Sequence, residues 1–309
     1  MNPSAGLNAY ASANPKKRLR PKHKEYAWGY LMIAPLFIGL CVLFIWPVFQ
    51  TFYFSFTDWS AFGQYTWTGA DNYRKLLNDP EFFRAFGNTL LYVVTFVPSL
   101  VALSVLAAVL LNQKIRGVGT YRTIYFIPAI MLPAAVAMVW RWLFNADYGL
   151  INAILRTFSI QGPRWLTDPD IALYSVVIVG LWSTVGFQTV IVLSGLQAIS
   201  SSYYEVAAIE GAGPFVRFFR ITLPLLTPTV FFVTVTSLIN AFQVFDLIYM
   251  MIGNVAIDQA QTIVYFFYKK AFVFNEKGYA SAVAMVLFAV ILIVTAFQMR
   301  LQNKWVFYE

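Results

Sequence analysis

Two carboxylates, Glu205 and Glu210, have the clearest capacity for chemistry in the segment YYEVAAIEGAG, which begins at Tyr203. A carboxylate in such a segment can cap the start of a helix. Ser202 and Glu205 have the spacing of a capping box, in which the serine caps the helix and the glutamate reaches back to the first free amide. The spacing therefore predicts a stiff helix from Tyr203 to about Ala212.

The same segment is rich in small residues that let another backbone or side chain approach closely, namely Ala207, Ala208, Gly211 and Ala212. We expect Gly213 to end the helix in a left-handed conformation and Pro214 to begin a second short helix, PFVRFFR. Arg217 and Arg220 would then lie in its last turn, where cations suit the helix dipole. The residues alone leave two readings open, a connector or re-entrant loop at the membrane and a rigid projection that fits a cleft in a soluble partner.

The sequence has few residues that could form a disulfide, a metal site, a catalytic site or a nucleotide-binding loop. Cys41 is the only cysteine and His23 the only histidine, which excludes a disulfide, a zinc site and a histidine-based catalytic site. The sequence has no Gly-Lys pair and therefore no phosphate-binding P-loop, and the stretch LSGLQ at residues 193–197 is interpreted as a chance likeness to an ATPase signature. We predict no catalytic residue, no metal site and no cofactor bound by this chain.

The composition indicates an integral membrane protein. Hydrophobic residues make up 59% of the 309 residues and charged residues only 12%, against about 25% in soluble domains. The net charge of +8 is concentrated before the first apolar run, in Lys16, Lys17, Arg18, Arg20, Lys22 and Lys24. Such a cluster holds a segment on the cytoplasmic side or touches anionic lipid, and it argues against nucleic-acid binding. The first apolar run therefore reads as an uncleaved signal anchor.

Six stretches are long and apolar enough for helical spans, which need about 20 residues each. They are residues 27–54, 88–112, 121–144, 172–197, 223–252 and 279–301. A further apolar stretch, 262–268, is cut short by Lys269 and Lys270 and is predicted to be an interfacial helix. Lys and Arg are more frequent on the side of the basic tail, so we expect both termini in the cytoplasm. The segments expected on the opposite side are too short for a catalytic domain, at about 55–87, 145–171 and 253–278.

The predicted membrane interior holds almost no charge. If the fifth span begins near Pro228, Asp246 lies about 27 Å along the helix and close to the outer interface. Arg141 likewise closes the third span at its outer end. Ion-coupled transporters usually need ionisable groups at mid-membrane, so this pattern favours a neutral or multiply hydroxylated cargo and an external source of energy.

The stretch YYEVAAIEGAGPFVRFFRITLPLLTP resembles the EAA motif of binding-protein-dependent ABC importer permeases, which reads E-A-A-x-x-D-G-A, nine residues, then I-x-L-P. Val206 replaces an alanine of that motif and Glu210 replaces its aspartate. The matching residues are Glu205, Ala207, Gly211, Ala212, Ile221, Leu223 and Pro224. Stretches such as PLFIGLCVLFIWPVFQTFYFSFTDW, TGADNYRKLLNDPEFFRAFGNTLLYVV and GYASAVAMVLFAVILIV resemble the carbohydrate branch of this family, the maltose-transporter type.

This resemblance covers about residues 27–309. It implies an all-α integral membrane fold of the type I importer kind, with six transmembrane helices and a cytoplasmic coupling loop at residues 200–224. The domains would be a basic cytoplasmic tail at 1–26 and a transmembrane domain at 27–309. The chain would be a non-catalytic permease in a bacterial cytoplasmic membrane, forming half of the pathway for a sugar or oligosaccharide.

The resemblance also implies partners and site residues. The expected partners are a second homologous permease, two ATPase subunits that carry ATP and Mg, and an extracytoplasmic sugar-binding protein. The expected coupling residues are Glu205, Ala207, Ala208, Glu210, Gly211 and Ala212. The expected substrate path uses Trp182, Thr184, Phe187, Gln188, Ser237, Asn240 and Gln243, of which Asn240 and Gln243 would share a helix face at a spacing of three. Packing between helices is the alternative role for each path residue.

Two other functional classes, an ion-coupled transporter and a membrane enzyme, fit the sequence less well. A stand-alone ion-coupled transporter lacks the buried charges it would need, and it leaves the 203–213 segment without a purpose. A membrane enzyme would need a convergent acid, base or metal cluster, and the sequence offers none. The cargo stays open among maltodextrin, lactose, another oligosaccharide and glycerol phosphate.

Overall fold

The computed structural model describes residues 22–59, 63–113, 117–252 and 257–307, and it is mostly helical. The chain forms two compact units, Met1–Gln50 and Thr51–Glu309. Most of the predicted basic tail lies outside the described residues. The boundary between the units falls inside α2, so each unit is treated by itself.

The described part of the first unit, from Lys22 onward, is one long helical run. It comprises α1 (Lys22–Leu40), the π-helical segment η1 (Cys41–Ile45) and the start of α2 (Trp46–Phe54). The residues on either side of η1 keep helical backbone angles, so the run is continuous. Pro47 follows two residues after η1, and the wider π turn relieves the clash between a proline ring and the carbonyl four residues before it.

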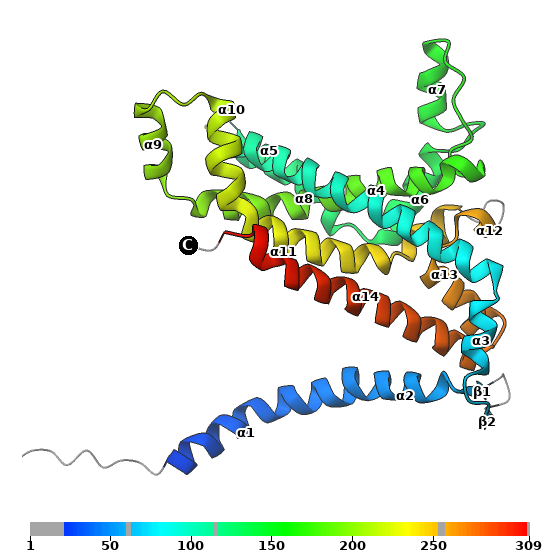
Figure 1. Ribbon diagram of the computed structural model, residues 1–309. Helices are drawn as coiled ribbons and strands as arrows, with labels where there is room; N and C mark the ends of the chain where they lie inside the picture. Colours follow the sequence, from blue (N-terminus) through cyan, green and yellow to red (C-terminus); the bar gives the residue numbers. More distant parts are fainter. Residues whose placement is uncertain (1–21, 60–62, 114–116, 253–256, 308–309) are drawn as a thin grey trace, which may run out of the picture. The chain divides into compact units, whose positions relative to one another are not determined.

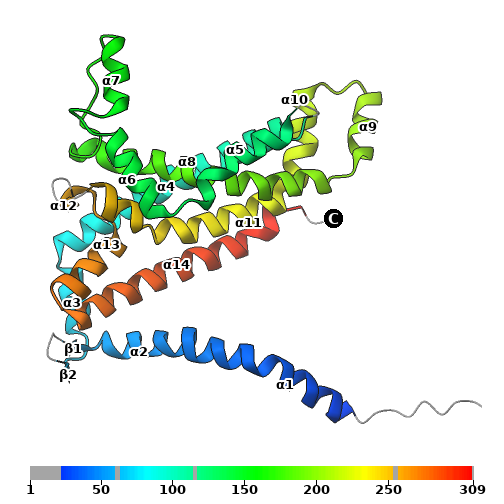
Figure 2. The ribbon, with the colours of Figure 1, turned by 180° about the vertical axis from the view of Figure 1, so that it is seen from behind.

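The second unit is built on four long helical elements (Figure 1). These are α4 (Pro80–Leu111), α8 (Pro169–Ala198), α11 (Leu223–Phe242) and α14 (Lys277–Trp305). Helix α4 lies against α8 and α11, and α11 also packs against α14, as Figure 2 shows from behind. Pro80 and Pro169 each stand at the first helical position, after Asp79 and Asp168, whose carboxylates accept backbone N–H groups as caps.

The predicted third span is broken. Helices α5 (Val118–Ile130) and α6 (Pro133–Leu143) are bent by 98° at Met131 and Leu132, so the stretch expected as a span at 121–144 consists of two helices with a break between them. Pro133 is the cause, because a proline disfavours helical angles in the residue before it, and Leu132 is extended. With this bent pair counted as one span, the described residues hold six candidate spans, and otherwise five.

The predicted fifth span is shifted along the chain. Helix α10 (Pro214–Arg217), the π segment η2 (Phe218–Thr222) and α11 form one helical run from Pro214 to Phe242. The span therefore starts nine residues before the expected residue 223 and ends ten residues before the expected residue 252. The expected second short helix of the coupling loop is thus the beginning of the fifth span.

Short elements join the long helices at the end of the second unit that is remote from α9 (Ser201–Ile209) (Figure 1). They are β1 (Thr57–Trp59) paired antiparallel with β2 (Tyr65–Trp67), α3 (Asp71–Leu77), α7 (Leu150–Thr157), η3 (Ile248–Ile252), α12 (Ile257–Ala260), and α13 (Ile263–Tyr268) continued by η4 (Lys269–Val273). The expected interfacial helix at 262–268 thus continues past the two lysines. Lys269 contacts Glu81 at 2.7 Å and Asp258 at 3.3 Å, and Lys270 contacts Glu81 at 3.2 Å.

Candidate functional site

Helix α9 begins earlier than the capping-box spacing predicts. Its N-cap is Ser200, whose hydroxyl accepts the Ser202 N–H at 3.4 Å and lies 2.8 Å from the Ser202 hydroxyl. The third helical position is then Tyr203, and Glu205 lies too far along the helix to reach the first free amide. The predicted box between Ser202 and Glu205 is therefore wrong, although a serine still caps the helix.

A glycine ends α9 in the left-handed conformation, but it is Gly211 (φ 74°) and not the expected Gly213, which is extended. The Gly211 N–H donates to the Ala208 carbonyl at 3.1 Å, and the Ala212 N–H donates to the Ala207 carbonyl at 2.9 Å. These two bonds form a Schellman motif, which satisfies carbonyls at the helix end. The Arg217 Nε donates to the Ala212 carbonyl at 2.7 Å and holds the turn against the next helix.

The coupling loop packs on one side and exposes apolar side chains on the other. Ala207 is buried, and the Tyr204 and Thr222 hydroxyls lie 3.1 Å apart, which joins α9 to η2. Ile209 is 87% exposed and Phe215 is 81% exposed. Of the six predicted coupling residues, Ala207 faces inward and Ala212 is half-buried, whereas Glu205, Ala208, Glu210 and Gly211 are exposed.

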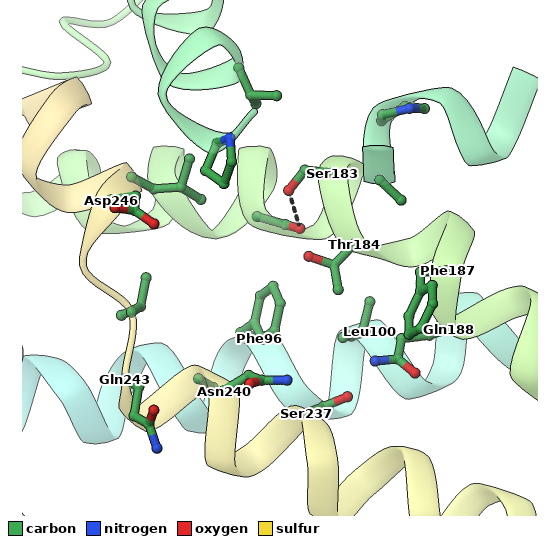
Figure 3. Close-up of a pocket in the computed structure, with 18 of the residues that line it drawn as sticks. Phe96, Leu100, Ser183, Thr184, Phe187, Gln188, Ser237, Asn240, Gln243 and Asp246 are labelled. Carbon is green, nitrogen blue, oxygen red and sulfur yellow. Dashed lines mark hydrogen bonds between the residues drawn. The ribbon is translucent and has the colours of Figure 1, made fainter. Parts of the chain in front are cut away.

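A cavity of about 400 Å³ lies between α4, α8, α11 and the bend of α5 and α6. Figure 3 shows polar side chains from α8 and α11 around it, with Phe96 and Leu100 from α4. Six of the seven predicted path residues line this cavity, namely Thr184, Phe187, Gln188, Ser237, Asn240 and Gln243. Trp182 does not, and its ring packs edge-on against Trp140 with 5.4 Å between centroids.

Helix α8 presents its cavity residues at helical spacing. Gly180, Ser183, Thr184, Phe187 and Gln188 follow one another at intervals of three and one, which places them on one face. Gly180 leaves room for Tyr92 and Phe96 of α4. Gly180 thus lets α4 approach α8 closely beside the cavity.

Helix α11 ends earlier than the sequence predicts, and this end decides how Gln243 and Asp246 lie at the cavity. Gln243 is the C-cap (φ −102°, ψ 14°), so it does not continue the helix face of Asn240, although both line the cavity. Asp246 begins the next helical turn, two residues before η3, and also lines the cavity. The prediction missed Asp246 because FQVFD contains no proline or glycine to signal the helix end.

Two cavity residues hold unpaired polar atoms. Gln188 is 3% exposed and Ser237 is 1% exposed. The Gln188 Oε1 and the Ser237 Oγ are buried without a hydrogen-bond partner among the described residues. Because each atom has almost no solvent-accessible surface, the two atoms face the packed interior, and Gln188 and Ser237 line the cavity through their other atoms.

The comparisons with known proteins agree with this architecture. Residues 77–307 match the family described as binding-protein-dependent transport system inner membrane component. The chain is similar to the probable ABC transporter permease protein YesP of Bacillus subtilis, with 33% identity over 96% of this chain and 97% of that protein. It is also 36% identical to the trehalose/maltose transport system permease protein MalF of Thermococcus litoralis, over 75% of this chain and 79% of that protein.

The fold matches a solved structure as well. A bacterial alginate ABC transporter, determined in complex with an alginate pentasaccharide-bound periplasmic protein, contains a chain with a TM-score of 0.82 and 21% identity. The match covers 93% of this chain and 98% of that chain.

Proposed function

The chain belongs to the binding-protein-dependent transport system inner membrane component family, and from that premise we propose how this permease subunit of an ABC importer carries its cargo and couples to its partners. We propose that it forms half of the path for a sugar or oligosaccharide delivered by an extracytoplasmic binding protein. The observation that carries the proposal is the cavity lined by amides, hydroxyls and aromatic rings. Amides bond sugar hydroxyls as donors and acceptors, and rings stack on sugar faces.

The relatives support a carbohydrate cargo. Besides the trehalose/maltose permease, they include the multiple sugar-binding transport system permease protein MsmF of Streptococcus mutans, which is 31% identical over 92% of this chain. Trp182 is the weakest of the proposed path residues, because it packs beside the cavity and not in it. Asn240, Gln243, Ser237 and Gln188 are the proposed hydrogen-bonding contacts.

The coupling loop is proposed to receive an ATPase subunit. The six residues Glu205, Ala207, Ala208, Glu210, Gly211 and Ala212 would shape the docking surface, and the exposed Ile209 and Phe215 would supply its apolar area. A second homologous permease would complete the path, and two ATPase subunits would bind ATP and Mg. This chain itself would bind no cofactor. Among the described residues, no group of three His, Cys, Asp or Glu could hold a metal ion.

The proposed orientation follows from the coupling loop. ATPase subunits are cytoplasmic, so the end of the second unit with α9 would face the cytoplasm, together with both termini and the basic tail at 1–26. The opposite end, with α7, α12 and α13, would face the binding protein. The membrane would be a bacterial cytoplasmic membrane.

The experiment that tests this proposal is isolation of the full-length chain from a host that expresses its neighbouring transport genes. We expect a second permease and two ATPase chains to co-purify, and reconstituted vesicles to take up an oligosaccharide only with ATP and the binding protein. An Asn240→Ala, Gln243→Ala double variant should lose most substrate-stimulated ATP hydrolysis. A chain that is isolated alone and transports with an ion gradient and no ATP would contradict the proposal.

A further inference from the structure

The one charged side chain among the described residues that line the cavity is negative. Asp246 is the only carboxylate among the described residues that line it, and no described Lys, Arg or His lines it. The other polar side chains on its wall are Ser183, Thr184, Gln188, Ser237, Asn240, Gln243 and the Tyr92 hydroxyl. Anion-binding sites usually hold Arg or Lys, and this wall offers neither.

The charge of Asp246 is not neutralised by a neighbour. The side chain is exposed, and none of the ion pairs among the described residues includes it. Figure 3 shows Asp246 in the segment after α11, at one end of the cavity, while Gln188 and Ser237 lie toward the other end. An occupant that enters past Asp246 therefore meets an uncompensated negative charge.

The wall at the other end is polar and carries no charge. Gln188, Ser237 and Asn240 line it, and amides and hydroxyls of this kind suit sugar hydroxyls both as donors and as acceptors.

We propose that this cavity admits uncharged or cationic polyhydroxylated cargo, such as neutral oligosaccharides or amino sugars, and rejects acidic sugars, with Asp246 as the residue that determines this selectivity. The proposal rests on the cavity being the path of the importer. It separates this chain from relatives named for acidic cargo, such as the sn-glycerol-3-phosphate transport system permease protein UgpA of Agrobacterium fabrum, which is 32% identical. Between low-dielectric walls, one carboxylate repels another anion more strongly than it would in water.

The charge selectivity can be measured without knowledge of the cargo. Cys41 is the only cysteine, so a Cys41→Ser chain offers a background for single reporter cysteines. A Thr184→Cys reporter, with Asn240→Cys as a second reporter, is placed in the full-length chain in membranes that contain the whole importer. The reaction rates with a cationic trimethylammonioethyl thiosulfonate and an anionic sulfonatoethyl thiosulfonate are compared with their rates on free cysteine.

We expect the cationic reagent to be favoured at both reporters, and Asp246→Asn to reduce that preference by at least about threefold, as loss of one nearby charge predicts. The preference at a Ser201→Cys control, on exposed α9, should not change with Asp246→Asn. Equal rates at the cavity reporters, faster anionic reaction, or no effect of Asp246→Asn would overturn the proposal.

A second arm separates this proposal from the transport function. Vesicles with the binding protein are offered a neutral trisaccharide, its amino-sugar counterpart and its uronic-acid counterpart. Uptake of the uronic acid at the rate of the neutral sugar would overturn the charge selectivity. Uptake of none of the three, with the thiol preference intact, would contradict the transport proposal and leave the electrostatic assignment of Asp246 standing.

Discussion

Gly211 and Gly213 occupy neighbouring places at the end of α9 but carry different backbone demands. Gly211 has φ 74° and Gly213 has φ −71°. A Cβ on either would meet no atom within 4 Å, so the two sites differ in backbone conformation and not in space. A residue other than glycine pays roughly 1–2 kcal/mol to adopt left-handed backbone angles. The Schellman turn at the end of α9 requires these angles at residue 211, and glycine adopts them without this cost.

We predict that Gly211→Val uncouples transport by straining this turn. ATPase subunits should be retained less well on purification, and uptake driven by ATP should fall by about tenfold, as a loss near 1.4 kcal/mol implies. Gly213→Val is the matched control and should keep both properties, because valine adopts extended angles readily. Equal losses in the two variants would show that glycine size matters at the loop and backbone conformation does not.

We predict that Gln188 lowers the thermal stability of the chain and is needed for transport. Gln188→Met keeps the volume and removes the unpaired acceptor, and leaving such a group buried costs about 1–3 kcal/mol. Thermal unfolding in detergent should therefore occur at the same or a higher temperature, while sugar-stimulated ATP hydrolysis falls.

The neighbouring Thr189 gives the comparison. It is also buried, but its hydroxyl already donates to the Val185 carbonyl at 2.7 Å, and it does not line the cavity. Thr189→Val should leave ATP hydrolysis unchanged. A Gln188→Met protein with full transport would remove Gln188 from the path.

At the scale of elements, a cluster of charges ties the start of α4 to α13 and η4. Glu81 contacts both Lys269 and Lys270, and the side chain of Lys270 is only 13% exposed. Glu81→Gln leaves two partly buried cations without their shared partner, so it should lower the free energy of unfolding by about 1–3 kcal/mol. The unfolding temperature of the purified chain measures this loss.

An exposed ion pair in α3 supplies the control. Asp71 and Arg74 lie 3.2 Å apart with 65% and 79% of their side chains exposed. Such pairs contribute about 0–1 kcal/mol, so Asp71→Asn should hardly move the unfolding temperature. If the two variants are equally stable, the cluster at Glu81 does not hold these elements together.

The same cluster predicts a flat pH dependence. Burial disfavours the charged form of Lys269, but hydrogen bonds and charges from Glu81 and Asp258 outweigh it and raise the pKa of Lys269. A raised lysine pKa gives stability that is fully present below the unfolded value and is lost only as pH rises through the folded value. The stability difference between the native chain and Glu81→Gln should therefore stay constant between about pH 6 and pH 9. A difference that shrinks within this range would exclude Lys269 as the partner.

The elements also show where sequence patterns suffice. Hydrophobic length located the spans, because lipid requires long apolar helices whatever their packing. The break before Pro133 carried a visible signal, since a proline disfavours a helical residue before it, but the apolar run around it masked the bend. The end of α11 at Phe242 carried no such signal, and packing of the following loop decides it.

For the second unit as a whole, the cavity residues could be predicted in part from the sequence. Polar residues in an apolar span stand out, and six of the seven singled out line one cavity. Asp246 was not assigned to the cavity because its place on the wall depends on a helix end that only the assembled unit fixes. The Schellman glycine was assigned two residues late, at Gly213, because both glycines fit the pattern and only the backbone angles distinguish them.

One continuous helix joins the coupling loop to the cavity. It runs from Pro214 to Phe242, so Asn240 lies about 39 Å along the axis from Pro214 at about 1.5 Å per residue. The π segment η2 lies between them and ends two residues before Pro224. The loop and the cavity are thus joined by an unbroken helical run.

The number of residues in this helix sets how the loop is oriented relative to the cavity. A π turn holds one residue more than an α turn, so η2 absorbs an extra residue, whereas deleting one residue from the regular helix of α11 would rotate the loop against the cavity by about 100°. Such a chain should still enter the membrane yet fail to transport, whereas a deletion at exposed Ser159 in the loop after α7 should be tolerated. Insertions and deletions during evolution should accordingly gather in the loops and leave the count from Gly211 to Asn240 fixed among functional relatives.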